Sequence, residues 1–89
     1  MHLKVGEYLK IRDRGNTYRW SWVPDWIGKH CPQYTGKISY WEYARNGDFG
    51  TVIYTVPSTI TPDMDICLFR TDGGAYFVFC ADGLERKGE

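Results

Sequence analysis

The 89-residue sequence lacks most of the features by which an enzyme or a membrane protein is recognised. It has only two histidines and three cysteines, and its longest apolar runs fall far short of the roughly 20 residues of a transmembrane helix. An excess of one charge is also missing, because eleven Lys and Arg residues balance eleven Asp and Glu residues. The net charge therefore does not favour duplex DNA, which attracts proteins mainly through phosphate neutralisation.

The first residues and the cysteines both indicate a cytoplasmic protein. Residues 1–7 have no basic head, apolar stretch or small-residue cleavage site, so no secretory signal is predicted. Cys31, Cys67 and Cys80 are odd in number and widely spaced, which is typical of free thiols in a reducing compartment. Metal ligands separated by about two to four residues are missing too, so no metal site is predicted.

Catalytic arrangements are equally scarce. His30 and Cys31 are chain neighbours that cannot face each other usefully on a loop. Asp63 and Asp65 share strand parity, but at a loop end where solvated turn acids are the simpler interpretation. The glycine-containing turns precede no helix, so they are no phosphate cradle. We therefore expect a protein without catalytic residues or a cofactor.

Aromatic residues are abundant instead, with four Trp, seven Tyr and four Phe. Several alternating or β-branched segments are separated by turn residues, which favours an all-β chain. The predicted strands are residues 3–12, 36–43, 51–56, 65–70 and 75–80. Asn46-Gly47 predicts a hairpin between the second and third of these strands, and residues 71–74 predict one between the last two.

The segment after the first strand is long and rich in aromatic residues. Residues 17–23 form either a short strand or an extended arm, and residues 24–28 form one helical turn at most, with Pro24 first and Gly28 last. No repeat or linker is visible. The sequence thus predicts a single domain, residues 1–89, built as a small five-stranded barrel or sandwich.

This order of elements resembles the Src-homology-3-like small barrels of bacteria and phages. Lys4-Val5-Gly6-Glu7-Tyr8-Leu9-Lys10-Ile11-Arg12 resembles their opening strand. Val23-Pro24-Asp25-Trp26 followed by Gly36-Lys37-Ile38 resembles their short turn and second strand, and Ala75-Tyr76-Phe77-Val78-Phe79 with Leu84-Glu85 resembles their last strand and closing turn. The resemblance implies a ligand-binding barrel, in which residues 13–35 are longer and richer in Trp than the usual loop.

The aromatic residues of this long loop are the candidate partner-binding surface. They are Tyr18, Trp20, Trp22 and Trp26, with Arg19 between the first two. Large rigid rings dominate binding hot spots, and the loop after the first strand is where the resemblance implies a ligand site. The alternative, weighed equally, is that these rings fill the core or cover an open barrel end.

Two further expectations concern the strands. Trp41 and Tyr43 share one strand face and Tyr40 the other, so we expect at least one of these faces in the core. A tight turn at residues 72–73 would place residue 67 opposite residue 78, which makes Cys67 and Cys80 diagonal neighbours on one face. We expect them to be core thiols.

The leading functional hypothesis is a non-catalytic module for protein–protein interaction. By resemblance, it would be a phage or mobile-element accessory protein that inhibits a host factor or defence complex. One alternative is binding of nucleic acid, with Arg12, Arg14, Arg19, Lys29 and Lys37 as the basic groups nearest the aromatic rings. Another is an oligomer that sequesters a nucleotide or small molecule.

Overall fold

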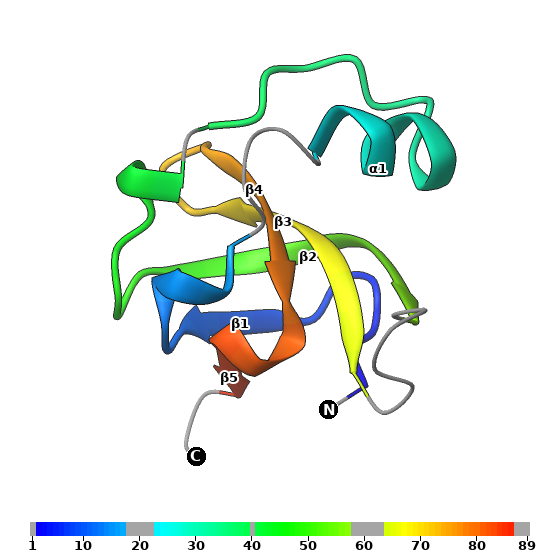
Figure 1. The fold of residues 1–89 in the computed structure, drawn as a ribbon. Helices are drawn as coiled ribbons and strands as arrows, with labels where there is room; N and C mark the ends of the chain where they lie inside the picture. Colours follow the sequence, from blue (N-terminus) through cyan, green and yellow to red (C-terminus); the bar gives the residue numbers. More distant parts are fainter. Residues whose placement is uncertain (1, 18–22, 40, 58–63, 87–89) are drawn as a thin grey trace.

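One antiparallel sheet of five strands forms the centre of the chain (Figure 1). The structure is a computed structural model that describes residues 2–17, 23–39, 41–57 and 64–86. The strands are β1 (Tyr8–Ile11), β2 (Phe49–Pro57), β3 (Asp65–Thr71), β4 (Tyr76–Cys80) and β5 (Leu84–Arg86). One helix, α1 (Val23–His30), and three 3₁₀ helices, η1 (Arg14–Asn16), η2 (Trp41–Tyr43) and η3 (Ala81–Gly83), complete the described part. The prediction of an all-β chain with little helix is confirmed.

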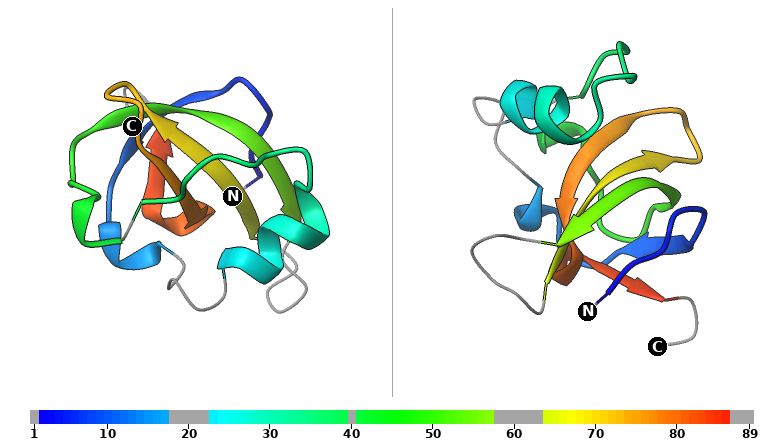
Figure 2. Two further views of the ribbon diagram at one scale, coloured as in Figure 1. Left: turned by 90° about the horizontal axis from the view of Figure 1, so that it is seen from above. Right: turned by 90° about the vertical axis from the view of Figure 1, so that its right-hand side faces the viewer.

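The strand order in the sheet is β4-β3-β2-β1-β5, and every pair is antiparallel. Strands β2, β3 and β4 follow one another as a meander, whereas β5 returns to the far side of β1. The sheet curls so that its two ends approach one another (Figure 2). The long connection between β1 and β2, residues 12–48, contains η1, α1 and η2.

The β3–β4 hairpin is confirmed, but the predicted register is wrong by one residue. Cys67 lies opposite Phe79, and Cys80 lies opposite Ile66, so the two cysteines face opposite sides of the sheet. The reason is the loop: the Thr71 N–H donates to the Ala75 carbonyl, which leaves a loop of three residues ending in Gly74 at φ +92°. Such loops place a residue in the left-handed region, where glycine is favoured.

The strand predicted at residues 36–43 is a second error. Residues 36–39 are irregular and residues 41–43 form η2, so β2 pairs with β1 and β3 instead. The Asn46-Gly47 turn does exist, with Gly47 at φ +94° and its N–H donated to the Ile11 carbonyl. It guides the chain into β2 alongside β1, rather than joining two strands as a hairpin.

Helix α1 is longer than the single turn expected, because Gly28 does not end it. Val23 and Trp26 lie three residues apart on one face and are buried against the sheet. Asp25 in the first turn and Lys29 in the last turn have the charges that the helix dipole favours. Packing of the apolar face outweighs the low helix propensity of one glycine.

Two apolar clusters lie on opposite sides of the sheet. The inner cluster collects residues from all five strands, including Leu9, Ile11, Val52, Cys67, Phe69, Phe77, Phe79 and Leu84. The helix-side cluster packs α1 against the outer side of β3 and β4 and includes Val23, Trp26, Cys31, Ile66, Leu68 and Val78. Strand β3 is therefore buried on both faces, which explains its unbroken run of buried residues from position 65 to position 69.

A β-bulge at Ile53 lets β2 contribute side chains to both clusters. Val52 pairs with Phe69 and faces the inner cluster, but the register shifts before Tyr54, which pairs with Leu68. The extra residue reverses the alternation of the rest of β2. Tyr54 and Val56 consequently pack on the helix-side cluster.

The edge of β4 that faces away from β3 is approached at two points by the long connection. Thr17 forms an isolated antiparallel bridge with Phe79, and the Ser39 N–H donates to the Tyr76 carbonyl at 2.8 Å. Backbone from residues 12–48 thus satisfies part of the outer edge of β4. The opposite edge strand of the sheet, β5, is only three residues long.

Gly50 on β2 is required by the Phe69 ring. A Cβ atom at this position would lie 2.7 Å from two Phe69 ring carbons, and it would also collide with the Arg70 carbonyl oxygen. Phe69 is fully buried, so its ring has no room to move away.

We expect Gly50→Ala to lower the free energy of unfolding by about 1–3 kcal/mol or more, because an overpacked core must shift backbone or rings. Gly73→Ala is the matched control, since the nearest atom to its new Cβ would be Thr71 Oγ1 at 3.9 Å. Urea unfolding followed by tryptophan fluorescence measures both. Equal stability of the two variants would contradict the packing of Phe69 on Gly50.

Candidate binding surface

The loop residues predicted to bind a partner fall into two groups. Tyr18, Arg19, Trp20 and Trp22 lie outside the described residues. Trp26 is 9% exposed, belongs to the helix-side cluster, and packs on His30 with ring centroids 5.3 Å apart. The indole of Trp26 is therefore part of the core beneath α1, as the alternative interpretation of these rings had it.

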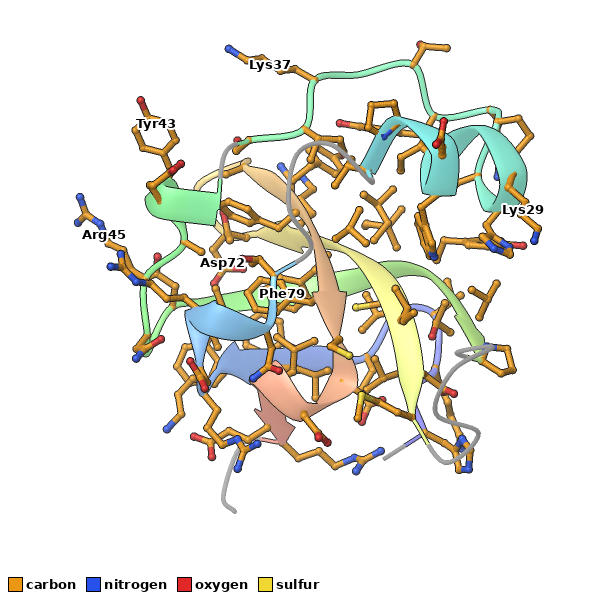
Figure 3. The ribbon with its side chains drawn as sticks, viewed as in Figure 1. Lys29, Lys37, Tyr43, Arg45, Asp72 and Phe79 are labelled. Carbon is orange, nitrogen blue, oxygen red and sulfur yellow. The ribbon has the colours of Figure 1, made fainter. Side chains whose placement is uncertain are left out.

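The basic residues proposed for nucleic-acid contact do not gather on one surface. The Arg12 guanidinium donates from Nε to the Asp82 carbonyl at 3.0 Å. Arg14 lies beside η2 and donates to the carbonyls of Glu42 and Ala44. Lys29 projects from α1, and Lys37 projects from the segment that follows it, well apart from Lys29 (Figure 3). These four cations lie on at least three separate parts of the molecule.

The three thiols are free and sheltered. Cys31 belongs to the helix-side cluster and Cys67 to the inner cluster, and Cys80 is half-buried with its Sγ 2.8 Å from Met64 Sδ. Burial raises the pKa of all three, so the nucleophilic thiolate is disfavoured. Within the described ranges, no three His, Cys, Asp or Glu side chains converge in a way that would hold a metal ion.

The outer side of the sheet is covered over only part of its area. On β3, Ile66 and Leu68 are buried under the helix-side cluster, whereas Arg70, two residues further along the same side, is exposed. The register continues from Arg70 to Thr51 on β2 and from Thr51 to Tyr8 on β1. The next row runs through Phe49 and Lys10 to Glu85. We call the surface formed by Tyr8, Phe49, Thr51, Arg70 and Asp72 the open face.

A stacked pair of rings lies at the centre of the open face. Tyr8 and Phe49 have ring centroids 5.4 Å apart and planes within 8° of parallel. The Tyr8 ring crosses β2, and its hydroxyl donates a hydrogen bond to Asp72 in the β3–β4 loop. The Asp72 N–H in turn donates to the Phe49 carbonyl at 2.9 Å. Although held on both sides, Tyr8 is still 45% exposed.

Charges around the open face are mostly paired. Lys10 Nζ lies 2.9 Å from Glu85 Oε1, and Arg86 Nε lies 2.6 Å from Glu7 Oε2. Arg70, by contrast, forms no ion pair or hydrogen bond through its side chain with any residue that the structure describes. The open face therefore combines exposed aromatic surface with one cation, Arg70, and one carboxylate, Asp72, and neither is in an ion pair with a described residue.

The sequence contained a signal for part of this surface. Alternation in residues 3–12 puts Leu9 and Ile11 on the core side and Tyr8 on the side of Lys10, which is where the structure has it. Phe49 and Asp72 gave no such signal, because their proximity to Tyr8 depends on the order of β1, β2 and β3 in the sheet.

The hydrogen bond to Asp72 raises the pKa of the Tyr8 phenol above its ordinary value of 10.0, and desolvation and the carboxylate charge raise it further. We expect Asp72→Asn to lower this pKa, because the phenolate no longer faces a negative charge. NMR titration with ring-labelled tyrosine measures the shift. Asp25→Asn on α1 is the control, and an identical Tyr8 titration in all three proteins would contradict the contact.

The second expectation is that the folded state loses stability at alkaline pH. Burial, the largest cause, raises the pKa of Cys67 far above 9.0 in the folded chain, so the unfolded chain loses this proton first as the pH rises. The unfolded state then binds fewer protons, and the free energy of unfolding falls above about pH 9 by up to ~1.4 kcal/mol per pH unit for this thiol. Urea unfolding between pH 8 and pH 9.5 should show that the free energy of unfolding falls less steeply with pH for Cys67→Ala than for the wild type. Equal slopes in the two proteins would contradict the raised pKa of Cys67.

No helix in the described part of the chain has the length and apolar character of a membrane span. Comparison of the chain with protein-family models, with curated proteins and with solved structures finds no match.

Proposed function

We propose that this protein is a non-catalytic binding module that acts through protein–protein interaction, with the open face as its contact surface. The observation that supports the proposal is the stacked Tyr8–Phe49 pair, in which Tyr8 is exposed and Phe49 half-buried, on a sheet whose neighbouring area is covered by α1. Tyrosine provides a large contact area with few rotatable bonds, and it is enriched in the hot spots of interfaces. Because both rings are held by strands, little conformational entropy is lost on binding.

We further propose that the curled sheet is a small five-stranded barrel of the Src-homology-3-like type. Support comes from the strand order β4-β3-β2-β1-β5, the long connection after β1 and the 3₁₀ turn η3 immediately before β5. The inner cluster, to which all five strands contribute, is the kind of core that fills a small barrel. The resemblance also supports the hypothesis that the protein is a cytoplasmic accessory protein of phage or mobile-element origin that inhibits a host factor.

The open face favours a protein over a nucleic acid as partner. Binding of single strands combines stacking rings with a positively charged groove that follows the backbone. The open face has one uncompensated cation, Arg70, and a carboxylate, Asp72, in the adjacent row. Lys29 and Lys37 lie on other parts of the molecule (Figure 3).

The experiment is affinity capture of a partner from host lysate on the immobilised whole protein, with and without nuclease treatment. We expect Tyr8→Ala to weaken binding of the captured partner by about thirtyfold, the effect of removing a typical hot spot. Tyr43→Ala is the matched control, since Tyr43 is 70% exposed but lies on η2.

A second variant separates binding from folding. Tyr8→Phe keeps the ring and loses only the hydroxyl, so it should retain most of the binding even if Tyr8→Ala lowers stability. Capture that disappears on nuclease treatment would instead assign the module to nucleic acid. Undiminished binding by folded Tyr8→Ala would remove the open face from the interface.

A further inference from the structure

Arg70 lies at the boundary between the covered and the open parts of the outer sheet side. On one flank its register partner is Tyr76, which is covered by Tyr34 at a ring-centroid distance of 4.8 Å. On the other flank its partner is Thr51, which pairs with Tyr8. Arg70 therefore belongs to the same row as Tyr8, one row from Phe49, and it is itself exposed.

The neighbouring cations have partners that Arg70 lacks among the described residues. Lys10 is held by Glu85, and Arg86 by Glu7. The Asp72 carboxylate accepts a hydrogen bond from the Tyr8 hydroxyl. An exposed guanidinium has five N–H donors arranged to hold a carboxylate with two parallel hydrogen bonds. The charge that would complement this surface is thus a negative one, placed over Arg70.

The partner charge that fits is a single carboxylate and not a run of phosphates. Asp72 lies one row from Arg70, so a second negative group beside the first would be repelled. The rest of the open face is formed by the Tyr8 and Phe49 rings and by Thr51, which favour an apolar side chain.

We infer that the open face takes an acidic, otherwise apolar segment of a partner protein: one Asp or Glu pairs with Arg70, and a bulky apolar side chain packs on the Tyr8–Phe49 pair. This inference rests on the proposed function and names the chemistry of its partner. Adjacent strands lie about 4.8 Å apart, so the Cα atoms of Arg70 and Tyr8, two strands apart, are separated by roughly 10 Å, and the Tyr8 ring, which crosses β2, spans part of this distance. An extended segment rises about 3.3 Å per residue, which places the two partner side chains about two or three residues apart.

The test uses a phage-displayed library of random dodecapeptides, selected on the immobilised whole protein. The expected enriched sequences carry an Asp or Glu two or three residues from Leu, Phe or Trp. A synthetic peptide from the selection should bind Arg70→Glu at least thirtyfold more weakly than the wild type, and its Glu→Lys form should bind Arg70→Glu better than it binds the wild type. Arg70→Lys should bind at an intermediate level, because an ammonium cannot form the paired hydrogen bonds.

Lys29→Glu is the matched control, because it makes the same change of charge on α1 (Figure 3). Selection of basic peptides, no enrichment, or equal loss in Lys29→Glu and Arg70→Glu would overturn the inference. Binding of a twenty-residue thymidine oligonucleotide that Arg70→Glu abolishes would overturn it too. If Tyr8→Ala blocks the captured partner but Arg70→Glu does not, the proposed function stands and the acidic segment is excluded.

Discussion

The burial of the β3–β4 hairpin on both faces is the constraint on which the rest of the structure depends. Phe69, Phe77 and Phe79 meet edge to face on the inner side, and Phe69 occupies the space that a side chain at Gly50 would need. On the outer side, Ile66, Leu68 and Val78 would be exposed to water without α1. A chain of 89 residues can bury such a hairpin only by using its long connection as a second layer.

The extent of that second layer decides which part of the sheet remains exposed. An eight-residue helix is about 12 Å long, which spans two or three strands. The bulge at Ile53 turns Tyr54 and Val56 toward the helix, so the layer ends on β2. Beyond this point the Tyr8–Phe49 pair rests directly on the sheet. Core packing and the candidate binding surface are thus two parts of one sheet side.

Elements governed by local patterns could be predicted from the sequence, and those governed by tertiary contacts could not. The Asp65–Thr71 and Tyr76–Cys80 strands follow from β-branched and aromatic residues around a glycine turn. The register of that hairpin depended on a loop of three residues, and the burial of Trp26 depended on where α1 packs. Residues 36–43 have strand-like composition, but β1 and β3 already occupy both sides of β2 where that segment would pair. The alternation of residues 3–12 puts Tyr8 on the strand side opposite Leu9, whereas the contacts of Tyr8 with Phe49 and Asp72 join distant parts of the chain.

The protection of the sheet edges has a consequence for how the molecule can associate. A long exposed edge strand offers a row of unpaired N–H and C=O groups, which invites strand addition and the growth of amyloid-like aggregates. Here the edge of β4 is approached by Thr17 and Ser39, and the opposite edge strand has three residues. A sheet edge pairs through backbone N–H and C=O groups, so strand addition does not depend on the partner's sequence. The side of a sheet makes contact through side chains, so such contact does depend on sequence. A sheet built in this way leaves little free edge for indiscriminate polymerisation, while its open face presents side chains.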